Sequence, residues 1–241
     1  MYNGYGIQLY SVRDAMSKDV ASTLENIAGL GYKYVEFAGF FGHSAEDIKK
    51  MLDDNGLICS GTHSSLDDLR PSKIFDTIKY HKTIKNPNYI IPYHDLSTLE
   101  KIKDFCSVVN FAKPILKAEG IELSYHNHSG EFKIMPWGGT IHSELERRTD
   151  IGFEIDTYWV YNAGLDPVKV LDKLIDRISV IHLKDGLPGG EGRTLGKGEA
   201  PCKAVIDYAR AKGLLMVVES ETLSPSGPDE AEACMEYLKS I

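Results

Sequence analysis

Four stretches in the second half of the chain place histidine, acidic or basic side chains two residues apart, just after a short apolar run. The pairs are His126 and His128, Glu154 and Asp156, His182 and Lys184, and Glu219 and Glu221. In an extended strand, residues two apart point to the same face, so each pair presents its side chains together. Imidazole and carboxylate groups are ligands of borderline divalent metals such as Mn, Co, Zn and Fe. If the four strands end side by side, the pattern predicts a shared metal site built from His126, Asp156, His182 and Glu219.

Taken one at a time, these residues also have purely structural explanations. A histidine at a strand end is commonly a hydrogen-bonded packing residue, and Lys184 is available as an ion-pair partner for Glu154. The metal hypothesis therefore depends on four successive strands each supplying a ligand, and hence on the fold.

The elements that would position these residues alternate regularly along the chain. Short apolar runs predict strands at Gly6–Tyr10, Tyr34–Phe37, Leu57–Thr62, Tyr89–Pro92, Ile121–His126, Gly152–Asp156, Ser179–Leu183 and Leu215–Glu219. Apolar residues at helical spacing predict helices that include Val20–Leu30, Ile102–Ala118 and Val168–Ile175. Ser44 is placed to cap a further helix, and Gly31, Gly56, Gly120 and Gly213 each close a helix before a strand.

Strands that alternate with helices predict a parallel sheet. About eight units of roughly 30 residues account for all 241 residues, which favours one (β/α)8 TIM-barrel domain over residues 1–241. An open doubly wound sheet is the alternative, but no strand is followed by a dinucleotide-type glycine fingerprint. In a barrel, the polar strand ends meet at the catalytic face. The glycine-rich segment 185–199 follows a strand, lacks a phosphate-loop pattern, and is expected to be a mobile surface loop that could serve as a lid.

Composition narrows the function classes further. The net charge of −8 disfavours a protein whose main task is to bind nucleic-acid backbones, and no apolar run is long enough for a membrane span. The four cysteines lack the spacing of a zinc site, so we interpret them as reduced cysteines that pack among apolar residues. Together with a start that shows no secretion signal, they lead us to expect a cytoplasmic protein.

Several motifs occur in an order that resembles a known family. They are GIQLYSVRD at 6–14, YHNH at 125–128, GFEIDTYWV at 152–160, HLKD at 182–185 and VESE at 218–221. With these runs the chain resembles the xylose isomerase-like sugar phosphate isomerase/epimerase family over essentially its whole length. The resemblance implies a TIM barrel and one divalent metal ion, with Mn as first candidate and Co, Zn, Fe or Mg compatible.

The resemblance also assigns ligands and shows two departures. In the family, Glu, Asp, His and Glu from the fifth to eighth strands hold the metal, and Asp156, His182 and Glu219 match the last three. His126 stands where the ketose 3-epimerases carry a glutamate, and Trp159 stands where they carry a substrate-binding histidine. In those epimerases two metal-bound glutamates exchange the substrate proton, whereas only Glu219 of that pair remains here.

Such a site suits proton abstraction next to a carbonyl through a metal-stabilised enediolate. Glu219 is the expected base, and the candidates for its proton-transfer partner are His128, Glu154 and Lys184. The expected substrate-binding residues are Tyr10, Glu36, His63 and Trp159. Isomerisation, epimerisation and elimination all pass through an enediolate, so all three remain open.

The expected partner is a small sugar or sugar derivative, with neither nucleic acid nor membrane. Barrels of this type often form homodimers, although no interface is marked in the sequence. Two other functions are weighed against the enzyme: a non-catalytic sugar-binding barrel that has lost its metal, and an endonuclease IV-like DNA-repair enzyme. The latter type holds three metals with many more ligands, whereas this chain has only 8 histidines.

Overall fold

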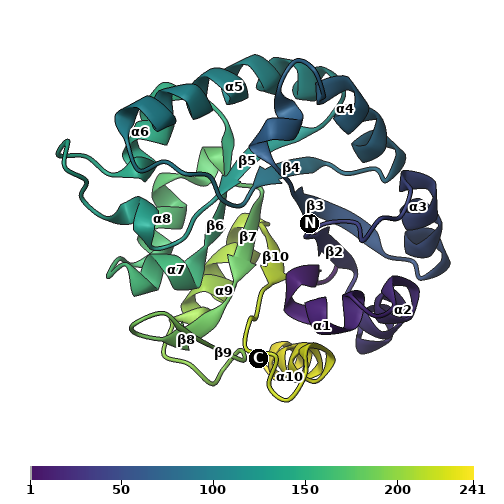
Figure 1. Cartoon of the computed structure of the whole chain (residues 1–241). Coiled ribbons are helices and arrows are strands. Elements are labelled where there is room, and N and C mark those ends of the chain that lie inside the picture. The colour runs from purple at the N-terminus through teal and green to yellow at the C-terminus, as the bar shows by residue number, and fades with distance from the viewer. Residues whose placement is uncertain (1) are drawn as a thin grey trace.

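A closed barrel of eight parallel strands forms the centre of the protein (Figure 1), as a computed structural model of residues 2–241 shows. The barrel strands are β1 (Gly6–Gln8), β2 (Tyr34–Phe37), β3 (Ile58–His63), β4 (Asn88–Ile91), β5 (Glu122–His126), β6 (Gly152–Asp156), β7 (Val180–Leu183) and β10 (Leu215–Val218). Each strand pairs with its neighbour in sequence, and β10 closes the ring against β1. The predicted TIM barrel is therefore confirmed.

Helices connect the strands and surround the barrel (Figure 1). They are α1 (Arg13–Met16), α2 (Val20–Leu30), α3 (Ala45–Asp54), α4 (Ile74–Thr83), α5 (Leu99–Ala118), α6 (Ile141–Arg148), α7 (Thr157–Asn162), α8 (Pro167–Lys173), α9 (Cys202–Lys212) and α10 (Gly227–Lys239). Short 3-10 turns occur at Leu9–Val12, Leu66–Leu69, Gly130–Phe132 and Ile175–Arg177. Among the described residues 2–241, no helix combines the length and apolar character that crossing a membrane requires.

Local capping explains where most of the helices begin and end. The Ser44 hydroxyl accepts a hydrogen bond from the Asp47 amide at 3.1 Å, which confirms the predicted cap of α3. Thr98 caps α5 in the same way, so that helix begins three residues before its predicted start at Ile102. Gly31 and Gly213 end α2 and α9 at φ of 105° and 71°, a backbone region that favours glycine.

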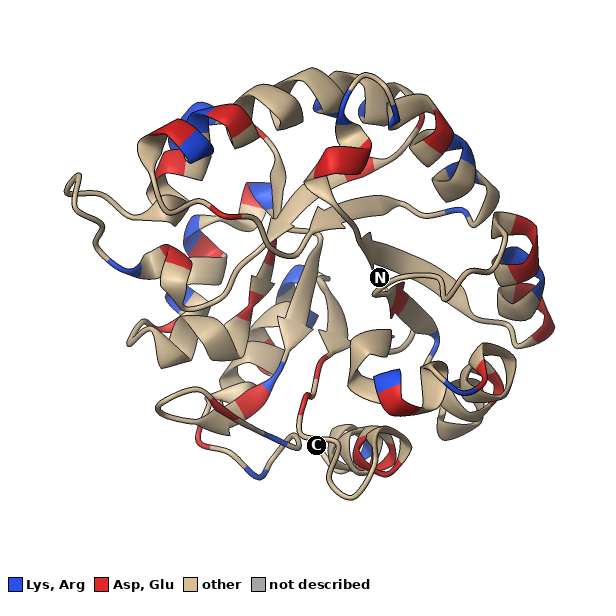
Figure 2. Cartoon of the chain, viewed as in Figure 1, with Lys and Arg blue, Asp and Glu red and all other residues tan. Residues whose placement is uncertain are grey.

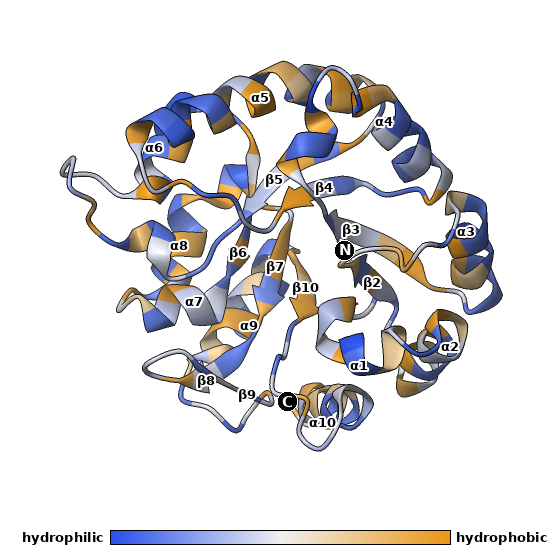
Figure 3. Cartoon of the chain, in the orientation of Figure 1, coloured by the Kyte–Doolittle hydropathy of each residue, from blue (hydrophilic) through white to orange (hydrophobic). Residues whose placement is uncertain are grey.

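Apolar side chains of the strands and of the inner helix faces form one large core, which includes Leu24, Phe105, Leu116 and Ile206. The outer helix faces carry most of the charged residues (Figure 2), and hydropathy changes accordingly across each helix (Figure 3). Charged side chains that do lie within the barrel are therefore exceptions that need partners, because burying an unpaired charge is costly.

The glycine-rich segment after β7 differs from its prediction as a mobile loop. It folds into an antiparallel hairpin of β8 (Asp185–Leu187) and β9 (Glu191–Arg193). The buried Asp185 carboxylate anchors it, because its two oxygens accept hydrogen bonds from four backbone amides, those of Gly186, Gly196, Gly198 and Ala200. A Cβ atom at position 198 would lie 2.2 Å from an Asp185 oxygen, so this anchor requires glycine there.

Outside the barrel lumen, His81 of α4 is a buried titratable group. Its Nδ1 lies 2.9 Å from the Asn86 amide nitrogen and 3.3 Å from the Thr62 hydroxyl. Burial lowers the pKa of His81 to about 4, which is below the ordinary value of 6.5 that the unfolded chain would show. Between these two pH values the unfolded state binds more protons than the folded state.

We therefore expect the contribution of His81 to stability to be complete above pH 6.5 and to be lost as the pH falls toward 4. The loss should approach about 3 kcal/mol in the free energy of unfolding. Urea unfolding of the parent and of His81→Leu at several pH values measures it. The variant should lose less stability between neutral and acidic pH than the parent, and parallel pH profiles would contradict the prediction.

Candidate active site

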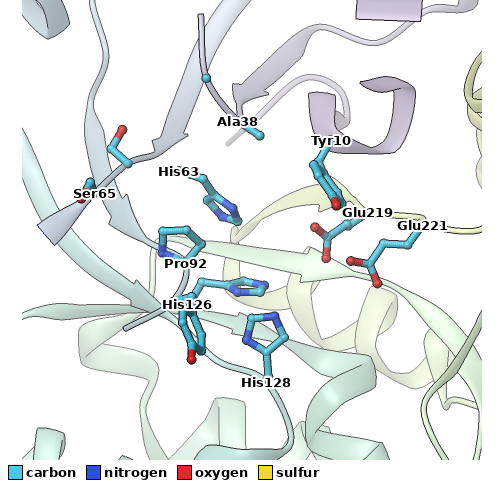
Figure 4. Close-up of a pocket in the computed structure, with 12 residues that line it drawn as sticks. Tyr10, Ala38, His63, Ser65, Pro92, His126, His128, Glu219 and Glu221 are labelled. Carbon is cyan, nitrogen blue, oxygen red and sulfur yellow. The ribbon is translucent and has the colours of Figure 1, made fainter. Parts of the chain in front are cut away.

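A cavity of about 600 Å³ opens at the carboxyl ends of the barrel strands. Figure 4 shows the side chains around it, and those able to do chemistry are Tyr10, His63, His126, His128, Glu219 and Glu221. The volume lies within the usual range for small-molecule sites. The sequence prediction that the polar strand ends meet in one place is confirmed.

The four predicted metal ligands lie together in the floor of this region. One ligand atom from each of His126, Asp156, His182 and Glu219 lies within 4.8 Å of the other three, and all four residues are buried. Nε2 of His126 is 3.6 Å from Oδ2 of Asp156, and Nδ1 of His182 is 3.4 Å from Oε2 of Glu219. The residues come from the ends of β5 and β6, from β7 and from the position after β10, and the parallel register pairs Asp156 directly with His182.

Several buried atoms of this cluster have no hydrogen-bond partner. They are both ring nitrogens of His126, Oδ2 of Asp156 and Nδ1 of His182. A buried polar atom without a partner costs about 1–3 kcal/mol. Of these atoms, Nε2 of His126 and Nδ1 of His182 lie 3.6 Å and 4.0 Å from Oδ2 of Asp156. Nitrogen and oxygen donors around one point match the coordination preferences of Mn, Fe, Co or Zn. The cluster therefore fits a divalent cation.

The protonation state of His126 agrees with this fit. Burial keeps the pKa of His126 well below its ordinary value, and the neighbouring His182 and His63 lower it further, so the imidazole is neutral. A neutral imidazole has the free lone pair that metal binding needs. Burial raises the pKa of Asp156 to about 6, an effect that Lys184 opposes and Glu219 reinforces.

Asp156 is held rigidly by two local contacts. Its side chain caps α7 by accepting a hydrogen bond from the Trp159 amide at 2.9 Å. Its backbone amide donates to the side-chain oxygen of Asn127 at 3.1 Å, which ties the end of β6 to the end of β5. Asn127 was not among the predicted site residues, although its position between His126 and His128 was a usable signal.

Glu36 lies beneath the cluster. Its Oε1 accepts hydrogen bonds from Nε2 of His182 at 2.8 Å and from the amide of Gln8 at 2.6 Å. Because Nε2 of His182 is directed to Glu36, Nδ1 faces Asp156 and Glu219, an arrangement typical of metal-ligating histidines. Glu36 was expected to bind sugar hydroxyls, but its side chain is 0% exposed and does not line the cavity. Its position instead suits orienting His182.

Glu154 also lies below the cavity. Its Oε2 is 2.8 Å from Nε2 of His63, so it pairs with His63 and not with Lys184 as the sequence suggested. Burial and the nearby Glu36 raise the pKa of Glu154 to about 8. Ligand atoms of His63, His126, Glu154 and His182 form a second compact group. We prefer the group with Asp156 and Glu219 as the metal site, because His63 and Glu154 already bind each other. Glu154 does not reach the cavity as a proton-transfer group.

Lys184 links two acidic side chains and is itself 1% exposed. Its Nζ is 3.2 Å from Oε2 of Glu219, it forms an ion pair with Glu221, and it lies 4.8 Å from the centre of the Trp159 ring. Burial opposes the charge, but Glu219 and Asp156 outweigh burial and raise the pKa of Lys184 above its ordinary value. Because Lys184 does not line the cavity and its ammonium group already pairs with Glu219 and Glu221, we infer that it stabilises these two carboxylates.

The remaining predicted residues divide between the cavity and its surroundings. Tyr10 and His63 line the cavity, and the Tyr10 ring is 43% exposed at its mouth. His128 also lines it, and its backbone amide donates to Glu131 at 3.0 Å. Trp159 does not line it, because its ring packs beside His128 at 5.7 Å between centroids.

Comparisons with known proteins support one family. The model of the xylose isomerase-like TIM barrel family matches residues 24–241. No curated protein matches the chain. A crystal structure of a sugar phosphate isomerase/epimerase from Parabacteroides distasonis is 27% identical, with a TM-score of 0.83 over 98% of both chains.

Two other solved structures share the fold at 12% identity. One is a probable 3-DHS dehydratase, AsbF, from Bacillus anthracis, with a TM-score of 0.75 over 98% of both chains. The other is an AP endonuclease, family 2, from Brucella melitensis, with a TM-score of 0.71 over 90% of this chain and 93% of that chain.

We expect Lys184→Met to lower the free energy of unfolding by about 3 kcal/mol, because the buried Glu219 loses its cation. Adding Glu221→Gln, which removes one of the two carboxylates, should restore part of that loss. Chemical denaturation of the parent, both single variants and the double variant measures the coupling between the two positions. Strictly additive effects would contradict the ion pair.

Proposed function

Because the chain belongs to the xylose isomerase-like TIM barrel family, we propose that it is a divalent-metal-dependent enzyme that removes a proton next to a carbonyl group of a sugar or sugar derivative. The observation that carries the proposal is the four-residue cluster of His126, Asp156, His182 and Glu219. Its His126 has two buried ring nitrogens without a partner, a state that a bound metal ion would relieve.

When bound, a divalent ion, with Mn as our first candidate, would stabilise the negative charge that develops on the substrate oxygens during proton removal. The chain's own residues supply the proton acceptor. Lys184 and His182 keep the pKa of Glu219 well below its ordinary value against the opposing effect of burial, so this carboxylate is ionised at neutral pH. Glu219 also lines the cavity, where it can accept the substrate proton on a carboxylate oxygen.

His128 is our candidate for the second proton-transfer group. Of the three partners considered for Glu219, only His128 lines the cavity, and Figure 4 shows its ring pointing into the same space as Glu219. Tyr10 and His63 would contact the sugar from the side of β1 and β3. Where the second proton goes decides between isomerisation or epimerisation and elimination of a substituent, and we retain both the isomerase and the lyase class.

Two observations favour this enzyme over its alternatives. A sugar-binding barrel without metal would leave the orphaned atoms of His126 buried at a cost. A nuclease would need cationic side chains for the DNA backbone, but no lysine or arginine lines the cavity within residues 2–241. The four cysteines are free and buried, which supports a reducing, cytoplasmic setting. Homodimer formation stays a prediction.

Metal content tests the first part of the proposal. Protein purified without chelator and dialysed against Mn should hold about one equivalent of divalent metal, because one ligand cluster is proposed. His182→Ala and Asp156→Ala should each lose it. Glu221→Gln is the matched control, since Glu221 lies outside the four ligands, and it should retain the metal. A parent that binds no divalent ion would contradict the proposal and favour the sugar-binding barrel.

Proton exchange tests the role of Glu219. The metal-loaded parent should incorporate solvent deuterium into at least one member of a panel of keto-sugars, followed by NMR. Glu219→Gln should lower the exchange rate by about 100-fold or more, because it removes the base. His128→Asn should slow product formation more than exchange, because the first proton transfer is kept. Exchange that survives in Glu219→Gln at the parent rate would refute this assignment.

A further inference from the structure

A second cavity, of about 630 Å³, lies beside the candidate active site. It opens between the segment after β4 and the segment after β5, and it shares Tyr93 and His128 with the first cavity. The loops that follow barrel strands are where substrates bind in this fold. A ligand seated in the first cavity can therefore extend past Tyr93 and His128 into the second.

The carboxylates that line the second cavity are already engaged. Glu131 is buried and accepts hydrogen bonds from the Tyr125 hydroxyl at 2.9 Å and from the His128 amide at 3.0 Å. Asp95 pairs with Lys101 at 2.5 Å. With these groups satisfied, the surface left to meet a ligand is mainly apolar and comes from Tyr93, Leu96, Met135 and Ile141. The other side chains in the lining are the polar His94, Ser97, His128 and Lys133.

Apart from the proposed metal ion, the first cavity offers no lysine or arginine to a phosphate group within residues 2–241. Its charged lining residues are the carboxylates Glu219 and Glu221, and the nearby Lys184 is buried and already paired with both. Arg13 at the mouth donates to the backbone oxygens of Tyr10 and Glu221. In the second cavity Lys133 is the one lysine or arginine among the described lining residues, and it is exposed.

From these observations we propose that the second cavity is a subsite for an apolar, aromatic substituent of the substrate. The substrate class is then an unphosphorylated sugar conjugate that carries a carbonyl group on its sugar ring, with that ring in the first cavity and its aromatic group against Leu96, Met135 and Ile141. This inference rests on the proposed function, because it uses the first cavity as the sugar site. It adds that recognition depends on apolar contact beside the sugar and not on a phosphate.

Binding of matched ligand pairs to the metal-loaded protein tests the subsite. Isothermal titration calorimetry would compare the methyl and phenyl β-glycosides of D-glucose, D-galactose and D-mannose, which lack the carbonyl group and serve as unreactive analogues. The free sugars and their 6-phosphates would be compared in the same way. For at least one sugar, the phenyl glycoside should bind about tenfold or more tightly than the methyl glycoside, because the ring leaves water. The sugar phosphates should bind no more tightly than the free sugars.

A substitution in the second cavity tests whether the preference for the phenyl glycoside arises there. Met135→Ser should reduce the advantage of the phenyl over the methyl glycoside and leave the affinity for the methyl glycoside unchanged. Met51→Ser is the matched control, because Met51 is a partly buried methionine on α3 that lines neither cavity. It should retain the full preference.

Three results would overturn the subsite: equal or absent binding of both glycosides in every pair, tighter binding of a sugar phosphate, or a phenyl preference that Met135→Ser leaves intact. These results are distinct from failure of the proposed function, which metal content and deuterium exchange report. A protein that binds metal and exchanges protons but shows no phenyl preference refutes the subsite alone.

Discussion

The arrangement of the active-site region depends on the imidazole of His182, which lies between two layers of acidic side chains. Its Nε2 is held by Glu36 at 2.8 Å, and its Nδ1 faces Glu219 at 3.4 Å. Glu36 comes from β2 and Glu219 follows β10, so one ring connects strands that are far apart in the sequence. With Nε2 directed to Glu36, the other nitrogen is left to face Asp156 and Glu219, as it would in a metal-ligating histidine.

Around His182 the protein buries an unusual amount of charge. Glu36, Glu154, Asp156 and Glu219 all have 5% or less of their surface exposed, and Lys184 is the buried lysine that accompanies them. Buried carboxylates are tolerated only when hydrogen bonds, cations or protons compensate them. Glu36 is compensated by histidine and glutamine, and Glu219 by Lys184, whereas Glu154 has a pKa raised to about 8. Asp156 and His126 keep atoms without partners. A cluster of buried charged groups adds no stability to the apolar core, so the presence of this cluster indicates a functional site.

The substitution of histidine for the usual first glutamate ligand, which the family resemblance identified, has a structural consequence. In the proposed mechanism His126 would supply a neutral ligand and no proton acceptor, which leaves Glu219 as the carboxylate base. Glu219 lies beside Glu221, and Lys184 forms ion pairs with both of them. These carboxylates lie on the side of the cavity opposite the loops after β4 and β5 (Figure 4). The apolar second cavity lies on the side of those loops. In the proposed mechanism the base Glu219 and the apolar subsite thus lie in different parts of the same barrel face, and His128 lines both cavities between them.

The barrel and the cluster of His126, Asp156, His182 and Glu219 could be predicted from the sequence because both follow from local periodicity. Apolar runs of strand length between amphipathic helices specify parallel strands, and the two-residue repeat places His126, Asp156 and His182 on the inner face. The partners of the charged groups could not be predicted in this way. Lys184 pairs with Glu219 and Glu221 instead of Glu154, and Glu36 orients His182 across a sequence separation of 146 residues. Such contacts are set by barrel closure, which brings β2 and β7 to a common centre. The hairpin anchored by Asp185 and the apolar cavity beside His128 likewise depend on how loops pack in three dimensions, and only the tertiary structure decides that.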